Sequence, residues 1–133
     1  MKTIDNVKPV ILVAEDDEGS RLLLKMFLGH KNCEVIFAKN GYEVLEHYKN
    51  NHLDLILMDV KMPGMDGSEA TSEIRKIELE RNAIIRIPII GITALFYSGS
   101  REMFLNSGMD YVLFKPVDIN ILSNLIYSLI DLN

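Results

Sequence analysis

The chain has 133 residues, of which 48% are hydrophobic and 25% are charged, and its net charge is −5. This length fits one domain with one core, and the composition excludes a disordered chain. The acidic charge disfavours contact with the phosphate backbone of nucleic acid, so no direct binding to nucleic acid is expected.

Two further features narrow the class of protein. Cys33 is the only cysteine, so the chain forms no internal disulfide, which is typical of a reducing compartment. No apolar run approaches the roughly 20 residues that span a bilayer, and residues 1–10 lack the apolar stretch of a signal peptide. We therefore expect a cytoplasmic location without membrane insertion.

After a polar lead-in at residues 1–8, which we expect to be flexible, two sequence patterns alternate along the chain. Short, continuous apolar runs predict strands, and longer segments with apolar residues three and four apart predict helices. Because the runs do not alternate with polar residues, they indicate strands buried on both faces, as in a parallel sheet between two helix layers. In chain order, the predicted elements are strand 10–14, helix 19–30, strand 35–38, helix 41–50, strand 53–58, helix 68–80, strand 87–92, helix 97–107, strand 111–114 and helix 118–131. Residues 9–133 are thus predicted to form a single doubly wound α/β domain.

Polar side chains follow four of the five predicted strands. Glu15 and Asp16 follow the first, and Asp59 follows the third. Thr93 follows the fourth strand, and Lys115 follows the fifth. A single Asp after a strand is most often a turn residue. Four such ends together indicate one site, because ligands of these sheets bind beyond the carboxyl ends of the strands.

The types of these side chains indicate phosphoryl chemistry, provided that the first and third strands are neighbours. Clustered carboxylates repel one another unless a cation lies among them. Mg²⁺ suits such a cluster, since it takes one or two carboxylates, several waters and a phosphate oxygen. Lys115 adds a positive charge and Thr93 a hydroxyl, which complete the groups that stabilise a phosphoryl group in transfer. An Asp carboxylate can itself accept that group.

Four segments of the chain resemble the receiver domains of two-component response regulators, such as chemotaxis regulators and the receivers of hybrid histidine kinases. Residues 11–16 resemble the strand that leads into their acidic pocket, and residues 58–67 resemble their phospho-acceptor segment. Thr93-Ala94 resembles their hydroxyl residue with a small neighbour, and Lys115-Pro116 resembles their lysine–proline step. The resemblance covers nearly the whole chain. It implies a flavodoxin-like fold whose five parallel strands have the order 2-1-3-4-5, flanked by five helices.

The resemblance implies a role for each of these residues. Asp59 is expected to accept a phosphoryl group from a phosphohistidine of a sensor kinase or a histidine-phosphotransfer protein. Mg²⁺, for which Mn²⁺ can substitute, is expected to bind Asp16, Asp59 and the backbone carbonyl of Lys61, and Glu15 acts through a metal-bound water. The remaining implied roles are phosphoryl contacts by Lys115 and Thr93, access to the acceptor beside Ala94, and a cis peptide before Pro116.

One position departs from the pattern of the family. Receivers commonly have Tyr or Phe three residues before the lysine, as a rotating switch residue, and here that position is Val112. Tyr111 is adjacent, but the alternation of a strand sends its side chain to the other face. We therefore expect the signal to pass through movement of Thr93 and ordering of the loop towards the surface around helix 97–107.

Three classes of function are compatible with these residues. The first is a signalling switch, which hydrolyses its own acyl phosphate slowly and is otherwise not an enzyme. The second is a phosphatase with an aspartyl nucleophile, but the haloacid dehalogenase group uses an Asp-x-Asp pair and position 61 is Lys here. The third is an interaction module that works without phosphate.

A homodimer is a further alternative. It would use the face made by helix 97–107, strand 111–114 and helix 118–131. Four aromatic residues belong either to this surface or to the core beneath it, and they are Phe96, Tyr97, Phe104 and Phe114. The chain is also compatible with a piece of a hybrid histidine kinase, which the Glu15-Asp16 pair favours.

Overall fold

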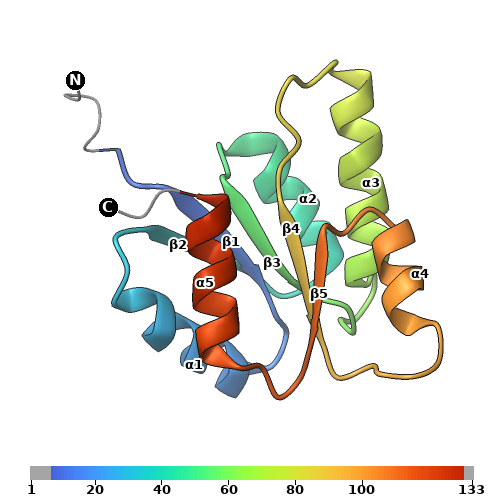
Figure 1. Ribbon diagram of the computed structural model, residues 1–133. Coiled ribbons are helices and arrows are strands. Elements are labelled where there is room, and N and C mark those ends of the chain that lie inside the picture. Colours follow the sequence, from blue (N-terminus) through green and yellow to red (C-terminus); the bar gives the residue numbers. More distant parts are fainter. Residues whose placement is uncertain (1–6, 131–133) are drawn as a thin grey trace.

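The computed structural model describes residues 7–130, which form one parallel sheet between two layers of helices (Figure 1). In chain order the elements are β1 (Val10–Ala14), α1 (Glu18–Gly29), β2 (Glu34–Ala38), α2 (Gly41–Asn50), β3 (Leu55–Asp59), α3 (Gly67–Glu80), β4 (Ile89–Thr93), α4 (Ser100–Asn106), β5 (Tyr111–Phe114) and α5 (Ile119–Leu129). The strand order is β2-β1-β3-β4-β5, so the predicted fold class and topology are confirmed. Residues 1–6 of the predicted lead-in and residues 131–133 lie outside the described residues.

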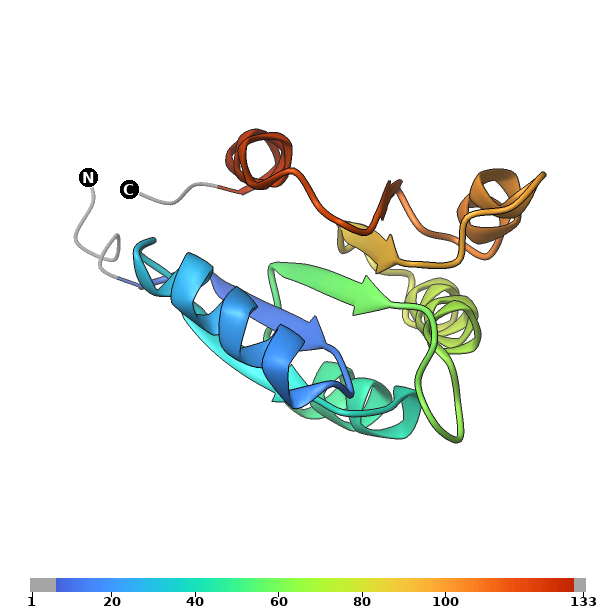
Figure 2. The same ribbon diagram turned by 90° about the horizontal axis from the view of Figure 1, so that it is seen from below.

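The two faces of the sheet are covered by different helices. α1 and α5 lie on one face, and α2, α3 and α4 lie on the other (Figure 1, Figure 2). Successive residues of β1 alternate between these faces, as the pleat of a strand requires. Ile11 belongs to the apolar cluster that contains Leu28 of α1, and Leu12 belongs to the cluster that contains Ile74 of α3. None of the helices within residues 7–130 has the length and hydropathy needed to cross a membrane.

The central and edge strands differ in burial. Every residue of β3 and β4 is buried, as predicted for strands covered on both faces. β2 and β5 lie at the edges, where residues 35–37 are only partly buried and Tyr111 is exposed, so the prediction that all five strands are buried on both faces is wrong for these two. An edge strand has a neighbour on one side only, and helices cover it less completely.

Three elements begin two or three residues later than predicted, and local hydrogen bonding accompanies each late start. Asp54 accepts the N–H of Val10 ahead of β3, and Pro88 has no N–H to donate ahead of β4. The N–H of Tyr97 binds the hydroxyl of Ser100, and Gly99 has a φ of 84°, so α4 begins only at Ser100. The loop between β4 and α4 is correspondingly longer than the sequence indicated.

Aspartates cap the helices that follow β1, β3 and β5. Asp17 accepts the N–H of Ser20, Asp118 accepts those of Asn120 and Ile121, and Asp66 forms a reciprocal capping box. Such a cap contributes about 1 kcal/mol. Three of the loops at the carboxyl end of the sheet are therefore fixed where they enter a helix, and this is the end that the sequence marked as the site.

A network of ion pairs joins α3 to the opposite end of the sheet. Arg75 binds both carboxylate oxygens of Glu78 at 2.9 and 3.0 Å, and it binds Asp110 at 2.8 Å. The same carboxylates accept backbone N–H groups at the start of β4: Glu78 accepts that of Ile87 at 2.8 Å, and Asp110 accepts that of Ile89 at 2.9 Å. These hydrogen bonds hold α3, β4 and the turn before β5 together.

Candidate functional site

The strand register places the polar residues that end or follow the strands side by side at the carboxyl edge of the sheet. β1 pairs with β3 so that Ala14 lies beside Met58, and therefore Glu15 and Asp59 are neighbours just beyond this pair. Further along the same sheet, β4 pairs with β5 so that Thr93 lies beside Phe114, which directly precedes Lys115. The condition that the first and third strands are adjacent is met.

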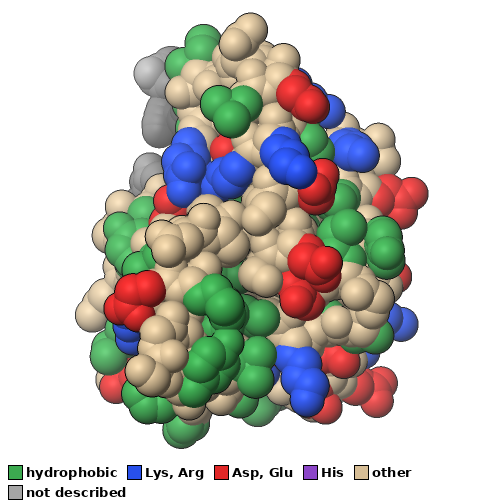
Figure 3. Space-filling model, turned by 90° about the vertical axis from the view of Figure 1, so that its right-hand side faces the viewer, with side chains coloured by type: hydrophobic (Ala, Val, Ile, Leu, Met, Phe, Trp, Pro, Cys, Tyr) green, Lys and Arg blue, Asp and Glu red, His purple; other side chains and the backbone are tan. Residues whose placement is uncertain are grey.

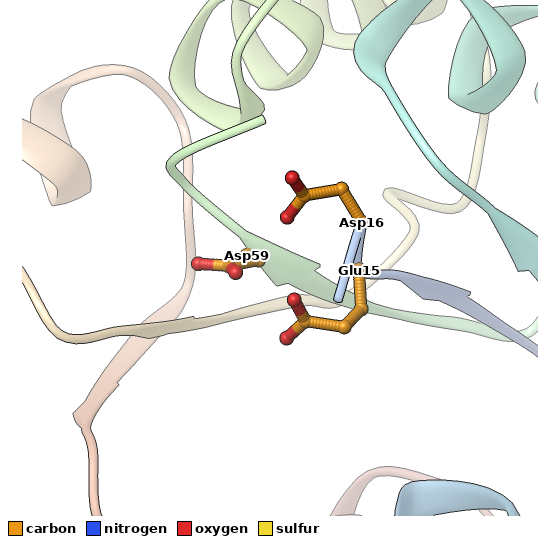
Figure 4. A group of neighbouring side chains, drawn as sticks. All are labelled: Glu15, Asp16 and Asp59. Atoms are coloured by element: carbon orange, nitrogen blue, oxygen red, sulfur yellow. The ribbon is translucent and has the colours of Figure 1, made fainter. Parts of the chain in front are cut away.

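Three carboxylates converge at this end of the sheet. Glu15, Asp16 and Asp59 each offer one oxygen, and these oxygens all lie within 4.8 Å of one another. Figure 4 shows Glu15 and Asp16 at the end of β1, with their carboxylates turned to the side where Asp59 ends β3. Glu15 is 2% exposed and Asp59 is 7% exposed, whereas Asp16 faces solvent. The cluster thus has a buried floor and an open side.

Lys115 supplies the positive charge of this cluster. Its Nζ lies 3.0 Å from Oε1 of Glu15 and 3.3 Å from Oδ2 of Asp59, so one ammonium bridges the two buried carboxylates. The peptide between Lys115 and Pro116 is cis, as the resemblance implied. Because a single ammonium faces three carboxylates, an excess of negative charge is left for a cation to offset.

The surroundings shift the pKa of two groups in the cluster. Burial, with the negative charge of Glu15 as a further cause, raises the pKa of Asp59 from 3.8 to about 6, although Lys115 opposes the shift. Burial disfavours the charged form of Lys115, but the hydrogen bonds and charges of Glu15 and Asp59 outweigh it and raise its pKa. Lys115 is therefore firmly charged near neutral pH, and Asp59 holds its proton more tightly than an ordinary carboxyl does.

The remaining predicted residues lie around this cluster. Thr93 is fully buried at the end of β4, and its hydroxyl accepts the N–H of Leu95 at 3.1 Å. Ala94 is exposed in the following loop, and Lys61 is exposed in the loop after β3. That second loop returns to the strand where the N–H of Gly67 binds the carbonyl of Val60 at 2.8 Å.

Two further residues shape this site: Gly67, which the sequence placed only in the phospho-acceptor segment, and Arg21, which was not predicted. A Cβ at Gly67 would collide with the backbone carbonyl of Asp59, so only glycine allows α3 to begin this close to the strand. Arg21 of α1 donates from Nη1 to the carbonyls of Glu15 and Asp16, both at 2.9 Å. The signal for Arg21 was a basic residue one turn into the helix that follows the acidic pair.

The predicted switch position is buried, and an aromatic cluster lies beside it. Val112 is 1% exposed and Tyr111 is 42% exposed, so the expected alternation of side chains along β5 is confirmed. The ring of Phe114 meets that of Phe96 edge-on, with 4.8 Å between centroids. The guanidinium of Arg101 lies 5.0 Å from the centroid of Phe114, and its Nη1 donates to the carbonyl of Val112 at 2.7 Å.

The aromatic residues near α4 divide between core and surface. Phe104 is 1% exposed and packs in the core, whereas Phe96 is 76% exposed and Tyr97 is 51% exposed. Hydrophobic side chains gather on the lower half of the face that includes α4 (Figure 3). Met103 and Leu105 of α4 are also exposed, at 48% and 38%.

The carboxylate cluster suits a magnesium ion. Glu15, Asp16 and Asp59 offer hard oxygen ligands, two of which are buried and held by Lys115, while the third is open to solvent. Mg²⁺ prefers such oxygen ligands and keeps part of its water shell. The donor set therefore fits the cation that the sequence predicted.

Comparison with known proteins gives one consistent family. The profile of the response regulator receiver domain matches residues 11–127. The sensor histidine kinase RcsC of Escherichia coli is 36% identical over 118 residues, which are 89% of this chain and 12% of RcsC. The sensor protein GacS of Pseudomonas syringae is 38% identical over 109 residues, which are 82% of this chain and 12% of GacS. The chain thus spans only a small part of the curated relatives that it matches.

Solved structures agree with the fold. In the complex of the Saccharomyces cerevisiae phosphotransfer protein Ypd1 with the receiver domain of Ssk1, the matching chain has a TM-score of 0.86 and 30% identity, and the match covers 92% of this chain and 88% of that one. The receiver domain of the Pseudomonas aeruginosa sensor histidine kinase PA1611, solved with magnesium in its active-site cleft, has a TM-score of 0.81 and 31% identity, and the match covers 92% of this chain and 98% of that one.

Proposed function

The chain belongs to the response regulator receiver family, and we propose that it acts in phosphorelay signalling by accepting a phosphoryl group on Asp59. The observation that carries this proposal is the position of Asp59 at the end of β3, between the carboxylates that follow β1 and the ammonium of Lys115. An oxygen nucleophile, a cation site and a fixed positive charge are thereby collected in one place.

The proposed donor is a phosphohistidine on a sensor kinase or a histidine-phosphotransfer protein. A carboxylate oxygen of Asp59 attacks the phosphorus in line, a phosphorus–oxygen bond forms, and the phosphorus–nitrogen bond breaks with its electron pair left on the imidazole. At neutral pH Asp59 is mostly ionised even with its pKa raised to about 6, so its carboxylate is available for attack. The charge of Lys115 offsets the negative charge on the phosphoryl oxygens.

We assign the metal site to the same cluster. Asp16, Asp59 and the backbone carbonyl of Lys61 would hold Mg²⁺ or Mn²⁺, and Glu15 would contact it through a water. When bound, the ion supplies positive charge at the phosphoryl oxygens and relieves the repulsion among the carboxylates. The buried carboxylates of Glu15 and Asp59 are already held by Lys115, so this half of the site is formed in advance.

The signal then leaves the site through the loop after β4. We infer that the hydroxyl of Thr93 gives up its bond to the N–H of Leu95 and turns to the phosphoryl group. The loop would carry Phe96 with it, and Phe96 contacts Phe114. Because Val112 is buried and aliphatic, this aromatic pair and Arg101 replace the rotating aromatic residue of other receivers. The added charge biases two conformations of the α4 surface.

The α4 surface is also the proposed self-association face. Phe96, Tyr97 and Met103 are each about half exposed or more, and exposed apolar patches mark interfaces. A phosphorylated chain would pair through α4, β5 and α5, in the cytoplasm and without direct contact to nucleic acid. Size-exclusion chromatography with light scattering before and after phosphorylation tests this, and an unchanged mass contradicts it.

Phosphorylation itself is tested by intact mass. Incubation with Mg²⁺ and a small phosphodonor such as acetyl phosphate should add one phosphoryl group to the wild type and none to Asp59→Asn. Asp118→Asn is the matched control, since Asn also caps a helix and Asp118 lies outside the cluster. An unmodified wild type, or equal modification of Asp59→Asn, contradicts the proposal. Repeated release of phosphate from ordinary monoesters would instead favour a phosphatase.

A further inference from the structure

The side chain of Arg21, in α1, binds the backbone of the acidic pair Glu15-Asp16. Its Nη1 donates to the backbone carbonyls of Glu15 and Asp16, both at 2.9 Å, so one guanidinium nitrogen uses its two hydrogens on two successive carbonyls. The backbone N–H of Arg21 binds the carbonyl of Asp17 at 2.9 Å, which ties the side chain to the first turn of the helix. Three consecutive carbonyls after β1 thus bind a single residue.

Other bonds fix the two ends of the same loop. The N–H of Glu15 binds the carbonyl of Ala38 at 2.9 Å and extends the strand pairing by one residue. The N–H of Asp17 donates to Oε2 of Glu15 at 3.1 Å, and Asp17 caps α1. Asp16 lies between these fixed points with an exposed side chain. The direction of its carboxylate therefore depends on the two peptide planes that Arg21 holds.

We propose that Arg21 is a positioning residue for the cation site, which holds the backbone of Glu15 and Asp16 so that their carboxylates converge with that of Asp59 before a metal binds. This inference rests on the proposed function, because it assigns Arg21 to the Mg²⁺ site of that function. A ligand set arranged in advance loses less freedom on binding, and outer partners of metal ligands commonly change metal affinity by 10- to 100-fold.

The sign of the effect separates positioning from simple charge. A guanidinium beside a cation site repels the cation, so on charge alone removing Arg21 would tighten Mg²⁺ binding. Loss of positioning has the opposite consequence, because Asp16 would sample directions that point away from Asp59. A weaker site in a variant that lacks this positive charge can therefore not be attributed to the charge itself.

The experiment measures Mg²⁺ affinity by calorimetric titration, and urea unfolding with and without Mg²⁺. Arg21→Gln should bind Mg²⁺ about 10-fold more weakly than the wild type. The free energy by which excess Mg²⁺ stabilises the folded protein should fall by about 1.4 kcal/mol, which corresponds to this tenfold loss of affinity. Lys25→Gln removes an exposed positive charge one turn further along α1 and should leave the affinity unchanged or slightly higher. Arg21→Lys keeps the charge and can donate to both carbonyls, so it should recover part of the loss.

Several outcomes would overturn the inference. Unchanged or tighter Mg²⁺ binding by Arg21→Gln would do so, as would a loss of stability that is equal with and without Mg²⁺, which would show a merely structural role. Equal weakening in Lys25→Gln would assign the effect to the charge of the helix. A wild type that binds no Mg²⁺ refutes the proposed metal site as well, whereas a binding wild type with an unaffected Arg21→Gln refutes only the role of Arg21.

Discussion

The two ends of the sheet differ in how completely their buried charges are compensated. At the amino ends of β4 and β5, Arg75 lies between Glu78 and Asp110, and each carboxylate also accepts a backbone N–H. At the carboxyl ends of β1 and β3, three carboxylates lie together, one ammonium binds only two of them, and the buried Asp59 has its pKa raised to about 6. One end is electrostatically complete, and the other is short of positive charge.

This difference separates structure from reactivity on a single sheet. A buried charge with full compensation holds elements together, and removing one partner is costly because the others stay buried and unpaired. A carboxylate with a raised pKa and incomplete compensation lowers stability in the absence of a cation, and it is the arrangement expected of functional sites. Substitutions at one end of the sheet should therefore leave the other end intact.

The largest effect is expected at the amino end. Arg75→Met should destabilise the protein by about 3 kcal/mol, because the buried Glu78 loses its cation while Asp110 keeps only its ion pair with Arg86. Urea unfolding measures this change. Lys76→Met is the matched control on the next residue, where an exposed pair with Glu73 contributes at most about 0.5 kcal/mol. A loss at Arg75 no larger than at Lys76 would contradict the assignment of this network to stability.

Phosphorylation should be nearly independent of that network. If Arg75→Met still folds, it should accept a phosphoryl group on Asp59 at close to the wild-type rate, since the two regions lie at opposite ends of the strands. A rate that falls in step with the loss of stability would show that the two ends of the sheet are coupled.

The second effect has the opposite sign and lies at the carboxyl end. Folding raises the pKa of Asp59 from 3.8 to about 6, so the folded state binds this proton more tightly than the unfolded state. Its contribution to stability is present below about pH 4 and is lost as the pH rises through 6. Asp59→Asn should therefore be more stable than the wild type at pH 7 in Mg²⁺-free buffer, by up to about 3 kcal/mol.

The pH dependence tests the cause of that gain. The difference between Asp59→Asn and the wild type should shrink towards zero at pH 4, and excess Mg²⁺ should reduce it at pH 7 by stabilising the wild type. Asp17→Asn is a control of opposite sign, because hydrogen bonds from Ser20 lower the pKa of Asp17 and its contribution is lost as the pH falls. A gain for Asp59→Asn that is the same at both pH values would point to packing rather than ionisation.

The sequence predicted the carboxyl end of the sheet better than the amino end. Glu15, Asp59 and Lys115 directly follow or end strands of high apolar content, so the fold alone brings them together. The Arg75 network was not predicted, because its partners are separated by up to 35 residues and form no periodic pattern. The backbone contacts of Arg21 were not predicted for a related reason. Every residue has a backbone carbonyl, so the sequence does not indicate which carbonyls accept a hydrogen bond.

The α4 surface shows the same limit. Phe104 and Phe96 are both phenylalanines in or directly before the predicted helix 97–107, but Phe104 is buried and Phe96 is 76% exposed. α4 begins late, after Gly99 in a left-handed conformation. Phe96 therefore lies within the loop between β4 and α4 and not directly before the first helical turn. Such a shift of three residues decides which aromatic side chains face the core, and helical spacing alone does not fix it.

The smallest effect concerns the aromatic pair next to the site. A double-mutant cycle with Phe96→Leu and Phe114→Leu should give a coupling of about 0.5 kcal/mol in the unmodified protein, because the rings meet edge-on but Phe96 is largely exposed. A cycle with Tyr111→Leu in place of Phe96→Leu should give none, since Tyr111 lies on the exposed side of β5. Unfolding experiments in urea measure both cycles.

Phosphorylation should change the environment of this pair and not that of Tyr111. In aromatic NMR spectra recorded before and after addition of phosphodonor and Mg²⁺, the resonances of Phe96 and Phe114 should shift because the loop after Thr93 moves. The Arg75 network should show no comparable change, since its charges are paired in both states. If the ring of Tyr111 changes rotamer while the pair stays still, the signal does not travel by this route. The carboxyl end would then be coupled to α4 through β5 itself.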